Sequence, residues 1–174
     1  MAAVEFALIL PMLIVLWIGG VEVTQALTMD RKVNNLASTV GDLVARWKSL
    51  TYSDVDSIFD IAGGVLYPYA AGSADMVLTA VNVDDKGNAT VAWSRAKGKR
   101  AAYSQGANMN AAIDAKLRTP SSQVIMTEAY YPYRPAVGHV ITGPIQLDSK
   151  LFFVPRLSSK VQLCTNSSAS KVCY

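Results

Sequence analysis

One carboxylate near the start of the chain stands where an ion pair is the expected chemistry. Glu5 directly precedes an uncharged run from Phe6 to Val21. A lone ionised side chain at the centre of a bilayer costs about 2.5–3.5 kcal/mol, so Glu5 needs a positive partner or a shallow position. The nearest candidate is the α-amino group of Met1, in the same chain or in another copy that stacks beside it with a stagger. Alternatively, Glu5 only complements the positive end of a helix dipole.

The remaining reactive side chains do not form a catalytic pattern. His139 is the only histidine, and its neighbours Gly138 and Val140 offer no partner for a nucleophilic triad. The carboxylates are scattered, and the sequence has neither a glycine-rich phosphate loop nor a metal-ligand spacing. We therefore expect a protein that is not an enzyme and that uses no cofactor and no metal.

Two cysteines near the end of the chain are placed to form a disulfide. Cys164 and Cys173 lie close together in a segment rich in Thr, Asn and Ser. In an oxidising compartment such a pair closes a small loop, whereas in a reducing cytosol both would stay free thiols. A metal site has little support, because the sequence has no Cys-x-x-Cys motif and no histidine near either cysteine. The preferred prediction is a disulfide in an exported protein.

Two short segments are candidates for surface contacts. The first is a cation cluster that could be a solvated loop or could contact DNA, an acidic surface or a neighbouring subunit: Arg95, Lys97, Lys99 and Arg100. The net charge of +3 is too small to argue for nucleic acid. In the second segment, aromatic side chains alternate between the two faces of a strand end, so at least one is exposed or meets a partner. Its candidates, Tyr131 and Tyr133, fit core packing and an interface equally well.

The first element that must position these groups is a helix of membrane-like composition. The uncharged run is shorter than the roughly 20 residues that span a bilayer core, and its extension to Thr28 includes Glu22. Glu22 then belongs at the membrane surface or against a partner. Pro11 removes a backbone donor, which predicts a bend. The adjacent Gly19 and Gly20 predict a local irregularity or close packing against another helix.

Apolar residues then recur every three or four positions, which predicts that the helix continues as an amphipathic helix to Ser49. These residues are Val33, Leu36, Val40, Leu43, Val44 and Trp47. A helix from Ala2 to Ser49 would be about 70 Å long. Because a compact domain of this size cannot cover that length, the first half of the helix must contact lipid or other subunits.

The rest of the chain predicts an α+β fold, with a small antiparallel sheet packed on the second half of the long helix. Ser53 to Asp56 has the capping pattern of a short helix, which Gly63 and Gly64 close. Further expected elements are a β-hairpin of 75–83 and 89–95, a small helix over 108–117, and strands at 123–131, 151–154 and 157–163. The predicted parts are a membrane or filament-core helix (1–28), its amphipathic continuation (29–50) and a globular α+β domain (51–174).

The first residues resemble the mature N-terminus of type IV pilins, most closely the TadE-like pilins and pseudopilins of the tight-adherence secretion system: Met1-Ala-Ala-Val-Glu-Phe-Ala-Leu-Ile-Leu-Pro11. The resemblance is most specific over residues 1–28. It implies that a prepilin peptidase removes a leader ahead of Met1. It also implies a cytoplasmic assembly ATPase and an inner-membrane platform as partners. The chain would wait in the bacterial inner membrane and end in an extracellular pilus.

We therefore expect a structural subunit that polymerises with other copies into a helical filament through its N-terminal helix. The assembly residues would be Met1, Glu5, Phe6, Pro11, Gly19, Gly20 and Glu22. The major tight-adherence pilin is very short and lacks a globular domain, so a minor pseudopilin that primes or caps the filament is an alternative. A different class of function is a membrane-anchored periplasmic binding protein that never polymerises.

Overall fold

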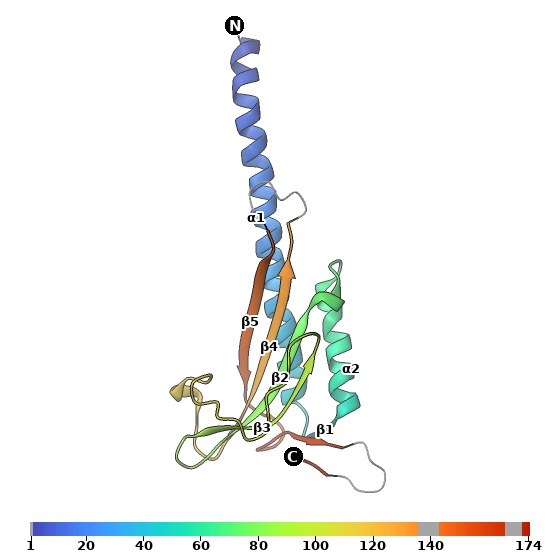
Figure 1. The fold of residues 1–174 in the computed structure, drawn as a ribbon, viewed down its shortest axis with the longest axis vertical. Helices are drawn as coiled ribbons and strands as arrows, with labels where there is room; N and C mark the ends of the chain where they lie inside the picture. Colours follow the sequence, from blue (N-terminus) through green and yellow to red (C-terminus); the bar gives the residue numbers. More distant parts are fainter. Residues whose placement is uncertain (1, 136–142, 166–171) are drawn as a thin grey trace.

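The computed structural model describes residues 2–135, 143–165 and 172–174, with only the backbone at Ala2 and Ala3. It has the predicted α+β fold, in which one long helix extends well beyond a small domain (Figure 1). The helices are α1 (Ala2–Ala45) and α2 (Tyr52–Gly63), with 3-10 turns at Gly64–Leu66, Ala71–Ser73 and Ala115–Leu117. The strands are β1 (Ser49–Thr51), β2 (Asp75–Val83), β3 (Ala89–Lys97), β4 (Gln123–Tyr133), β5 (Ile145–Phe153) and β6 (Gln162–Cys164).

Helix α1 is continuous along its whole length. Pro11 lies inside it without ending it, although proline cannot donate a helical hydrogen bond. The helix also continues through Gly19 and Gly20, so the predicted local irregularity is absent from the single chain. At this point the Thr24 hydroxyl donates a hydrogen bond to the Gly20 carbonyl at 2.8 Å.

The end of α1 differs from the prediction. The helix stops at Ala45 rather than at Ser49. The Trp47 amide donates to the Val44 carbonyl at 3.0 Å, which makes a turn that leads into β1. Trp47 therefore leaves the apolar stripe of the helix and its side chain is exposed.

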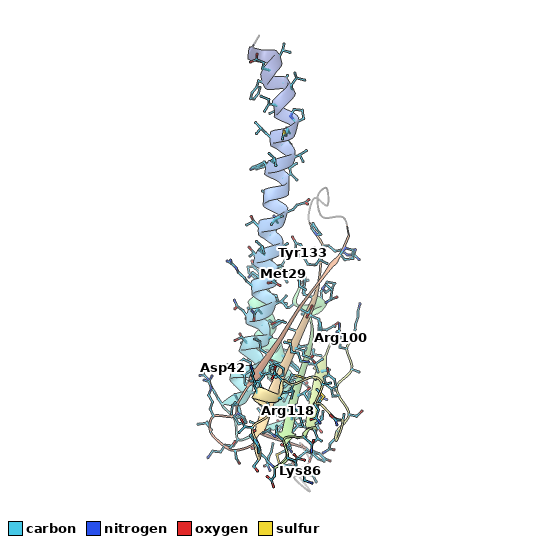
Figure 2. The ribbon with its side chains drawn as sticks, turned by 90° about the vertical axis from the view of Figure 1, so that its left-hand side faces the viewer. Met29, Asp42, Lys86, Arg100, Arg118 and Tyr133 are labelled. Carbon is cyan, nitrogen blue, oxygen red and sulfur yellow. A yellow bond between two sulfur atoms is a disulfide. The ribbon has the colours of Figure 1, made fainter. Side chains whose placement is uncertain are left out.

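The second half of α1 completes the core of the domain. One stripe of its side chains packs on β4 and β5, as the predicted amphipathic spacing requires. Each of these residues is at most 2% exposed: Met29, Val33, Leu36, Ala37, Val40 and Val44. Figure 2 shows Met29 at the level of Tyr133, near the far end of β4, with the rest of the helix extending past it. Burial of one such Val or Leu contributes about 1.5–3 kcal/mol.

The main sheet is antiparallel with the strand order β3-β2-β4-β5. Its β2–β3 pair is the predicted hairpin. Both helices cover the same face, because Leu78 of β2, Trp93 of β3 and Ile125 of β4 share one buried cluster with residues of α1 and α2. The sheet thus positions α1 on one pair of strands and α2 beside it.

Two predictions in the second half of the chain are wrong. The segment 108–117 forms turns and one 3-10 turn instead of a small helix. Met109 and Ile113 are still buried, because this segment crosses the opposite face of the sheet beside Met126. The expected strand at 157–163 is reduced to β6, which does not join the main sheet. It pairs in parallel with β1, where Leu50 lies opposite Leu163.

Helix α2 begins at Tyr52, with Thr51 as its N-cap, rather than at the predicted Ser53. The Thr51 hydroxyl oxygen accepts from the Asp54 amide. The Asp54 carboxylate accepts from the Thr51 hydroxyl at 2.6 Å and from the Thr51 amide at 2.8 Å. These hydrogen bonds from Thr51 lower the pKa of Asp54 below its ordinary value of 3.8. The ionised Asp54 carboxylate therefore stabilises the folded chain above pH 3.8, and this stabilisation is lost as the pH falls through the lowered pKa.

Close contact between α1 and β5 depends on Gly41. A β-carbon at this position would lie 2.2 Å from two ring carbons of Phe153. Such a separation is far inside van der Waals contact, so the ring has to move when Gly41 carries a side chain. Gly41 is therefore a packing requirement of the domain and not a flexible point of the helix.

We expect Gly41→Ala to destabilise the domain, although alanine is better than glycine by about 1 kcal/mol in a helix interior. Overpacking of this kind costs about 1–3 kcal/mol, so the expected net loss is about 1 kcal/mol. Thermal unfolding of the full chain in detergent measures it. Gly20→Ala is the matched control, because a β-carbon there meets nothing within 4 Å. An unfolding midpoint as high for Gly41→Ala as for Gly20→Ala would contradict the packing argument.

Candidate functional site

Apart from Glu5, the part of α1 that precedes the domain is apolar on all sides. We call residues 4–21 the exposed section of α1. Its large side chains point outward around the whole helix, with Leu8 76% and Trp17 73% exposed (Figure 2). Within the described residues, α1 is the one helix long and apolar enough to cross a membrane. Its apolar stretch has a mean hydropathy of 2.3, and none of that stretch is buried. A helix without a polar face needs lipid or other helices around it.

Glu5 lies in the first turn of α1 and is exposed. It is the acidic residue of that turn, where it complements the helix dipole. The amine of Met1, its predicted partner, lies outside the described residues. The ion pair with a second copy therefore stays a prediction.

Glu22 is buried, whereas the sequence places it at the membrane surface or against a partner. It is 1% exposed. Glu22 precedes Met29 by about two helical turns, so both lie on the stripe of α1 that faces the sheet. Its charge is close enough to act on the phenol of Tyr133 in β4. Glu22 is thus the point at which α1 enters the domain, not an interfacial side chain facing water.

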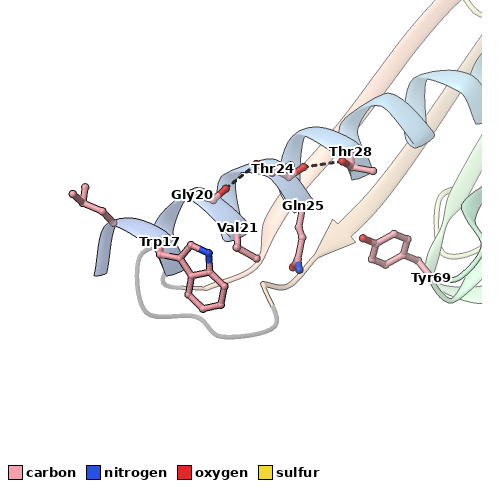
Figure 3. Close-up of a pocket in the computed structure, with 8 residues that line it drawn as sticks. Trp17, Gly20, Val21, Thr24, Gln25, Thr28 and Tyr69 are labelled. Carbon is pink, nitrogen blue, oxygen red and sulfur yellow. Dashed lines mark hydrogen bonds between the residues drawn. The ribbon is translucent and has the colours of Figure 1, made fainter. Parts of the chain in front are cut away.

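A hollow of about 480 Å³ lies beside the end of the exposed section nearest the domain. Figure 3 shows Tyr69, from the segment between α2 and β2, on the other side of this hollow. The lining from α1 consists of Leu16, Trp17, Gly20, Val21, Thr24, Gln25 and Thr28. The lack of a side chain at Gly20 leaves the helix surface accessible here. The hollow has the size and character to receive apolar groups of a neighbouring helix.

The segment that forms this helix, apolar outside the domain and amphipathic inside it, matches a known protein family. Residues 1–42 match the TadE-like protein family. The predicted resemblance is confirmed over this segment, which covers α1 as far as Asp42 and ends before the first strand. The match associates the chain with Tad pili and membrane anchoring, and the TadE-like family is not an enzyme family. No curated protein and no solved structure gives a significant match to the chain.

Outside the TadE-like segment, two members of the cation cluster are paired within the chain. Arg95 bonds Asp56 of α2 at 2.9 Å and lies over the ring of Tyr52, 4.9 Å from its centroid. Lys97 forms an ion pair with Asp60 of the same helix. These contacts join β3 to α2. These two cations therefore form ion pairs within the chain instead of lying in the predicted solvated loop.

The other two cations of the cluster are exposed. Arg100 lies over the ring of Tyr130, 3.5 Å from its centroid, and Lys99 follows the end of β3. With the charges of Arg95 and Lys97 compensated, the cluster offers less attraction for an anionic polymer than its sequence indicates. A nucleic-acid contact gains no support from this arrangement.

Tyr131 and Tyr133 are core residues, which overturns their selection as surface contacts. They are 8% and 3% exposed and belong to the cluster between the sheet and α1. Alternate residues of a strand share one face, and in β4 this face is covered by α1. Tyr130 points to the opposite face, where it is half-buried beneath Arg100.

A buried charge network that the sequence analysis missed joins the loop after β3 to the sheet. Glu128 of β4 accepts a hydrogen bond from the Tyr103 hydroxyl at 3.0 Å and pairs with Lys150 at 3.3 Å. Burial, and then the charge of Glu128, raises the pKa of Tyr103 to about 12, so this phenol stays protonated at neutral pH. Glu128 is the one charged residue of β4, and a lone charge in an apolar strand could have indicated this network from the sequence.

Metal-ligating side chains do not gather in the described part of the chain. No group of three or more His, Cys, Asp or Glu side chains that could hold a metal occurs in those ranges. His139 lies outside the described residues.

A disulfide joins Cys164 of β6 to Cys173. It closes a loop next to the pair formed by Leu163 and Tyr174, whose amides and carbonyls exchange hydrogen bonds of 3.0 and 3.2 Å. The disulfide therefore holds the last described residues beside β6.

We expect the denatured, unreduced exported protein to show no reactive thiol. Replacing both cysteines by serine should cost about 2–3 kcal/mol of unfolding free energy, because the loop closure no longer restricts the unfolded chain. Thiol labelling followed by mass spectrometry measures the first result, and chemical unfolding of the serine variant measures the second. Prior reduction is the control and should expose both thiols. Full labelling without reductant would rule out the disulfide.

Proposed function

We propose that this chain is a structural subunit of an extracellular Tad-like or type IV pilus, and that it polymerises through the exposed section of α1. One observation carries the proposal. Apart from Glu5, residues 4–21 form a helix that is apolar on every side, whereas the same helix completes the core of a folded domain from Glu22 onward. Such a surface is too large and too apolar to face water.

The exposed section suits two successive environments. At 1.5 Å per residue it is about 27 Å long, close to the roughly 30 Å hydrocarbon core of a bilayer. Before assembly, lipid of the inner membrane would cover it. In the filament, the same sections of other copies would replace the lipid, and the domains would be displayed outside. This route requires a prepilin peptidase, an assembly ATPase and an inner-membrane platform as partners.

The contacts between copies follow from the same surface. The Glu5 carboxylate would pair with the Met1 amine of a neighbouring copy, since an unpaired charge in the apolar bundle is costly. The hollow between Gly20 and Tyr69 would receive side chains of an adjacent helix. Polymerisation would thus cover both the apolar section and its one carboxylate.

Electron microscopy of sheared cell-surface material, with quantitative mass spectrometry of the filaments, tests the proposal. The chain should be a main component of filaments that are missing from a deletion strain. Trace amounts at the filament ends would instead indicate a minor pseudopilin that primes or caps the filament. Presence in the membrane with normal filaments lacking the chain would contradict polymerisation and would favour a membrane-anchored binding protein.

A further inference from the structure

An aromatic cleft lies in the globular domain, away from the exposed section of α1. It has a volume of about 240 Å³. Four separate segments line it with aromatic side chains: Tyr52 at the start of α2, Trp93 in β3, Tyr103 in the following loop, and Tyr174. In Figure 1, β1 and the last residue lie at the end of the molecule opposite to the N-terminus.

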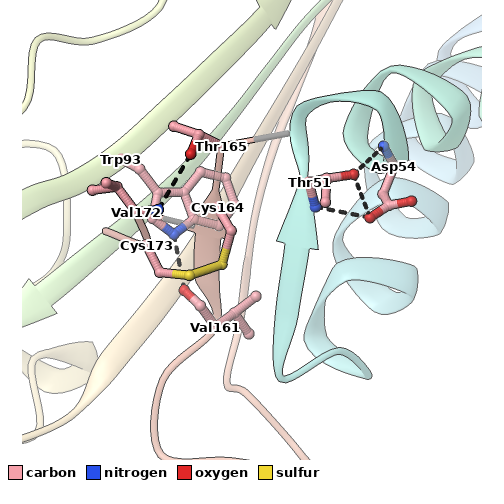
Figure 4. Close-up of a disulfide and its surroundings, with 8 residues drawn as sticks. All are labelled: Thr51, Asp54, Trp93, Val161, Cys164, Thr165, Val172 and Cys173. Atoms are coloured by element: carbon pink, nitrogen blue, oxygen red, sulfur yellow. Dashed lines mark hydrogen bonds between the residues drawn. A yellow bond between two sulfur atoms is a disulfide. The ribbon is translucent and has the colours of Figure 1, made fainter. Parts of the chain in front are cut away.

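The floor and one wall of the cleft are held in place by backbone contacts. The Trp93 indole donates from Nε1 to the Val161 carbonyl at 2.8 Å. Figure 4 shows this bond next to the disulfide. The paired hydrogen bonds with Leu163 and the disulfide at Cys173 hold the Tyr174 backbone against β6. The disulfide therefore helps to shape the cleft.

The other two aromatic walls are also positioned before any ligand binds. Tyr52 follows Thr51, the N-cap of α2, and lies beneath the guanidinium of Arg95. Tyr103 is held at both ends, because its amide donates to the Ser94 hydroxyl at 3.2 Å and its phenol donates to Glu128. A binding site with fixed walls loses little conformational entropy when a ligand enters.

The chemistry of the lining is neutral and polar. Among the described residues, none of the side chains that line the cleft carries a charge, and Arg95 at its margin is paired with Asp56. The exposed amide of Gln105 offers two donors and an acceptor, and the phenols of Tyr52 and Tyr174 add hydroxyl groups. Aromatic faces beside amide and hydroxyl groups suit a ligand with an apolar C–H face and a rim of hydroxyls.

We propose that this cleft binds one ring of a neutral saccharide, with the ring face on an aromatic wall and its hydroxyls on Gln105. The volume is below the roughly 300–1,000 Å³ of sites for drug-sized ligands, so a single sugar ring of a longer glycan fits its scale. A phosphate-bearing ligand would find no compensating cation among the lining residues. The inference concerns the displayed domain and does not depend on whether the chain polymerises.

Saturation-transfer NMR on the full chain tests the proposal, in a phosphocholine detergent because sugar-headed detergents would compete. The probes are cellotriose and maltotriose as neutral glycans and N-acetylneuraminic acid as an anionic sugar. At least one neutral trisaccharide should receive saturation at its ring C–H protons, with a dissociation constant of about 1–10 mM. Absence of transfer to both neutral probes at about 10 mM, or stronger transfer to the anionic sugar, would overturn the proposal.

Substitutions of residues that line the cleft test whether the saccharide binds there. Tyr174→Ala and Gln105→Ala should each weaken binding roughly fivefold or more, as expected for loss of a stacked ring or of a directed hydrogen bond. Tyr174→Phe should bind within about twofold of the original chain, because the ring is kept. Tyr67→Ala is the control, an exposed tyrosine outside the cleft lining. Unchanged binding by Gln105→Ala, whose side chain is exposed and not needed for folding, would contradict the assigned site.

Discussion

Glu5→Ala should reduce incorporation of the chain into filaments by roughly a hundredfold or more, while its insertion into the membrane stays the same or improves. In the filament core, loss of one partner leaves the other charge buried and unpaired, which costs about 3–5 kcal/mol. Each 1.4 kcal/mol corresponds to a tenfold change in an equilibrium constant. The measurement is the ratio of chain in sheared filaments to chain in the membrane fraction, by quantitative immunoblotting.

Glu5→Gln separates the charge from the shape of the side chain and should reduce incorporation nearly as much as alanine. Asp30→Ala is the matched control, because Asp30 is an exposed carboxylate of the same helix within the domain. It should leave incorporation unchanged. An undiminished filament yield from Glu5→Ala would remove the pairing hypothesis and leave Glu5 with a helix-dipole role.

A chain that starts at Glu22 should fold as a soluble domain, whereas one that starts at Thr51 should aggregate or lose cooperative unfolding. The shorter chain lacks the whole apolar stripe of α1 and the first residues of β1. Each fully buried Val or Leu contributes about 1.5–3 kcal/mol, and the total stability of a domain is about 5–15 kcal/mol. Loss of the stripe therefore exceeds what the remaining sheet can tolerate. Size-exclusion profiles and thermal melts, after expression in an oxidising compartment, decide the outcome.

A point substitution gives the same test in a folded chain. In residues 22–174, Leu36→Ala should cost about 2–5 kcal/mol, because Leu36 is fully buried between α1 and the sheet. Its exposed neighbour Asn35 is the control, and Asn35→Ala should change the unfolding free energy by less than about 0.5 kcal/mol. The packing of α1 on the sheet would be wrong if residues 51–174 were as stable as residues 22–174.

Local patterns in the sequence determined much of the architecture. The uncharged run from Phe6 to Val21 and the amphipathic repeat that follows it predicted a helix too long for its own domain. Helix α1 is continuous across both. The alternation in 75–83 and 89–95 gave the hairpin of β2 and β3. These features depend on periodicity within one segment, so neighbours in sequence are sufficient to reveal them.

The tertiary structure decided which face of each element is covered. Tyr131 and Tyr133 share a face by strand geometry, but the position of α1 makes that face the core. Glu22 is buried for the same reason, since it lies on the stripe that meets β4. The pairing of β6 with β1 and the contact of Phe153 with Gly41 join residues far apart in the chain. No local pattern specifies such contacts, because burial and close packing depend on which surfaces the folded chain brings together.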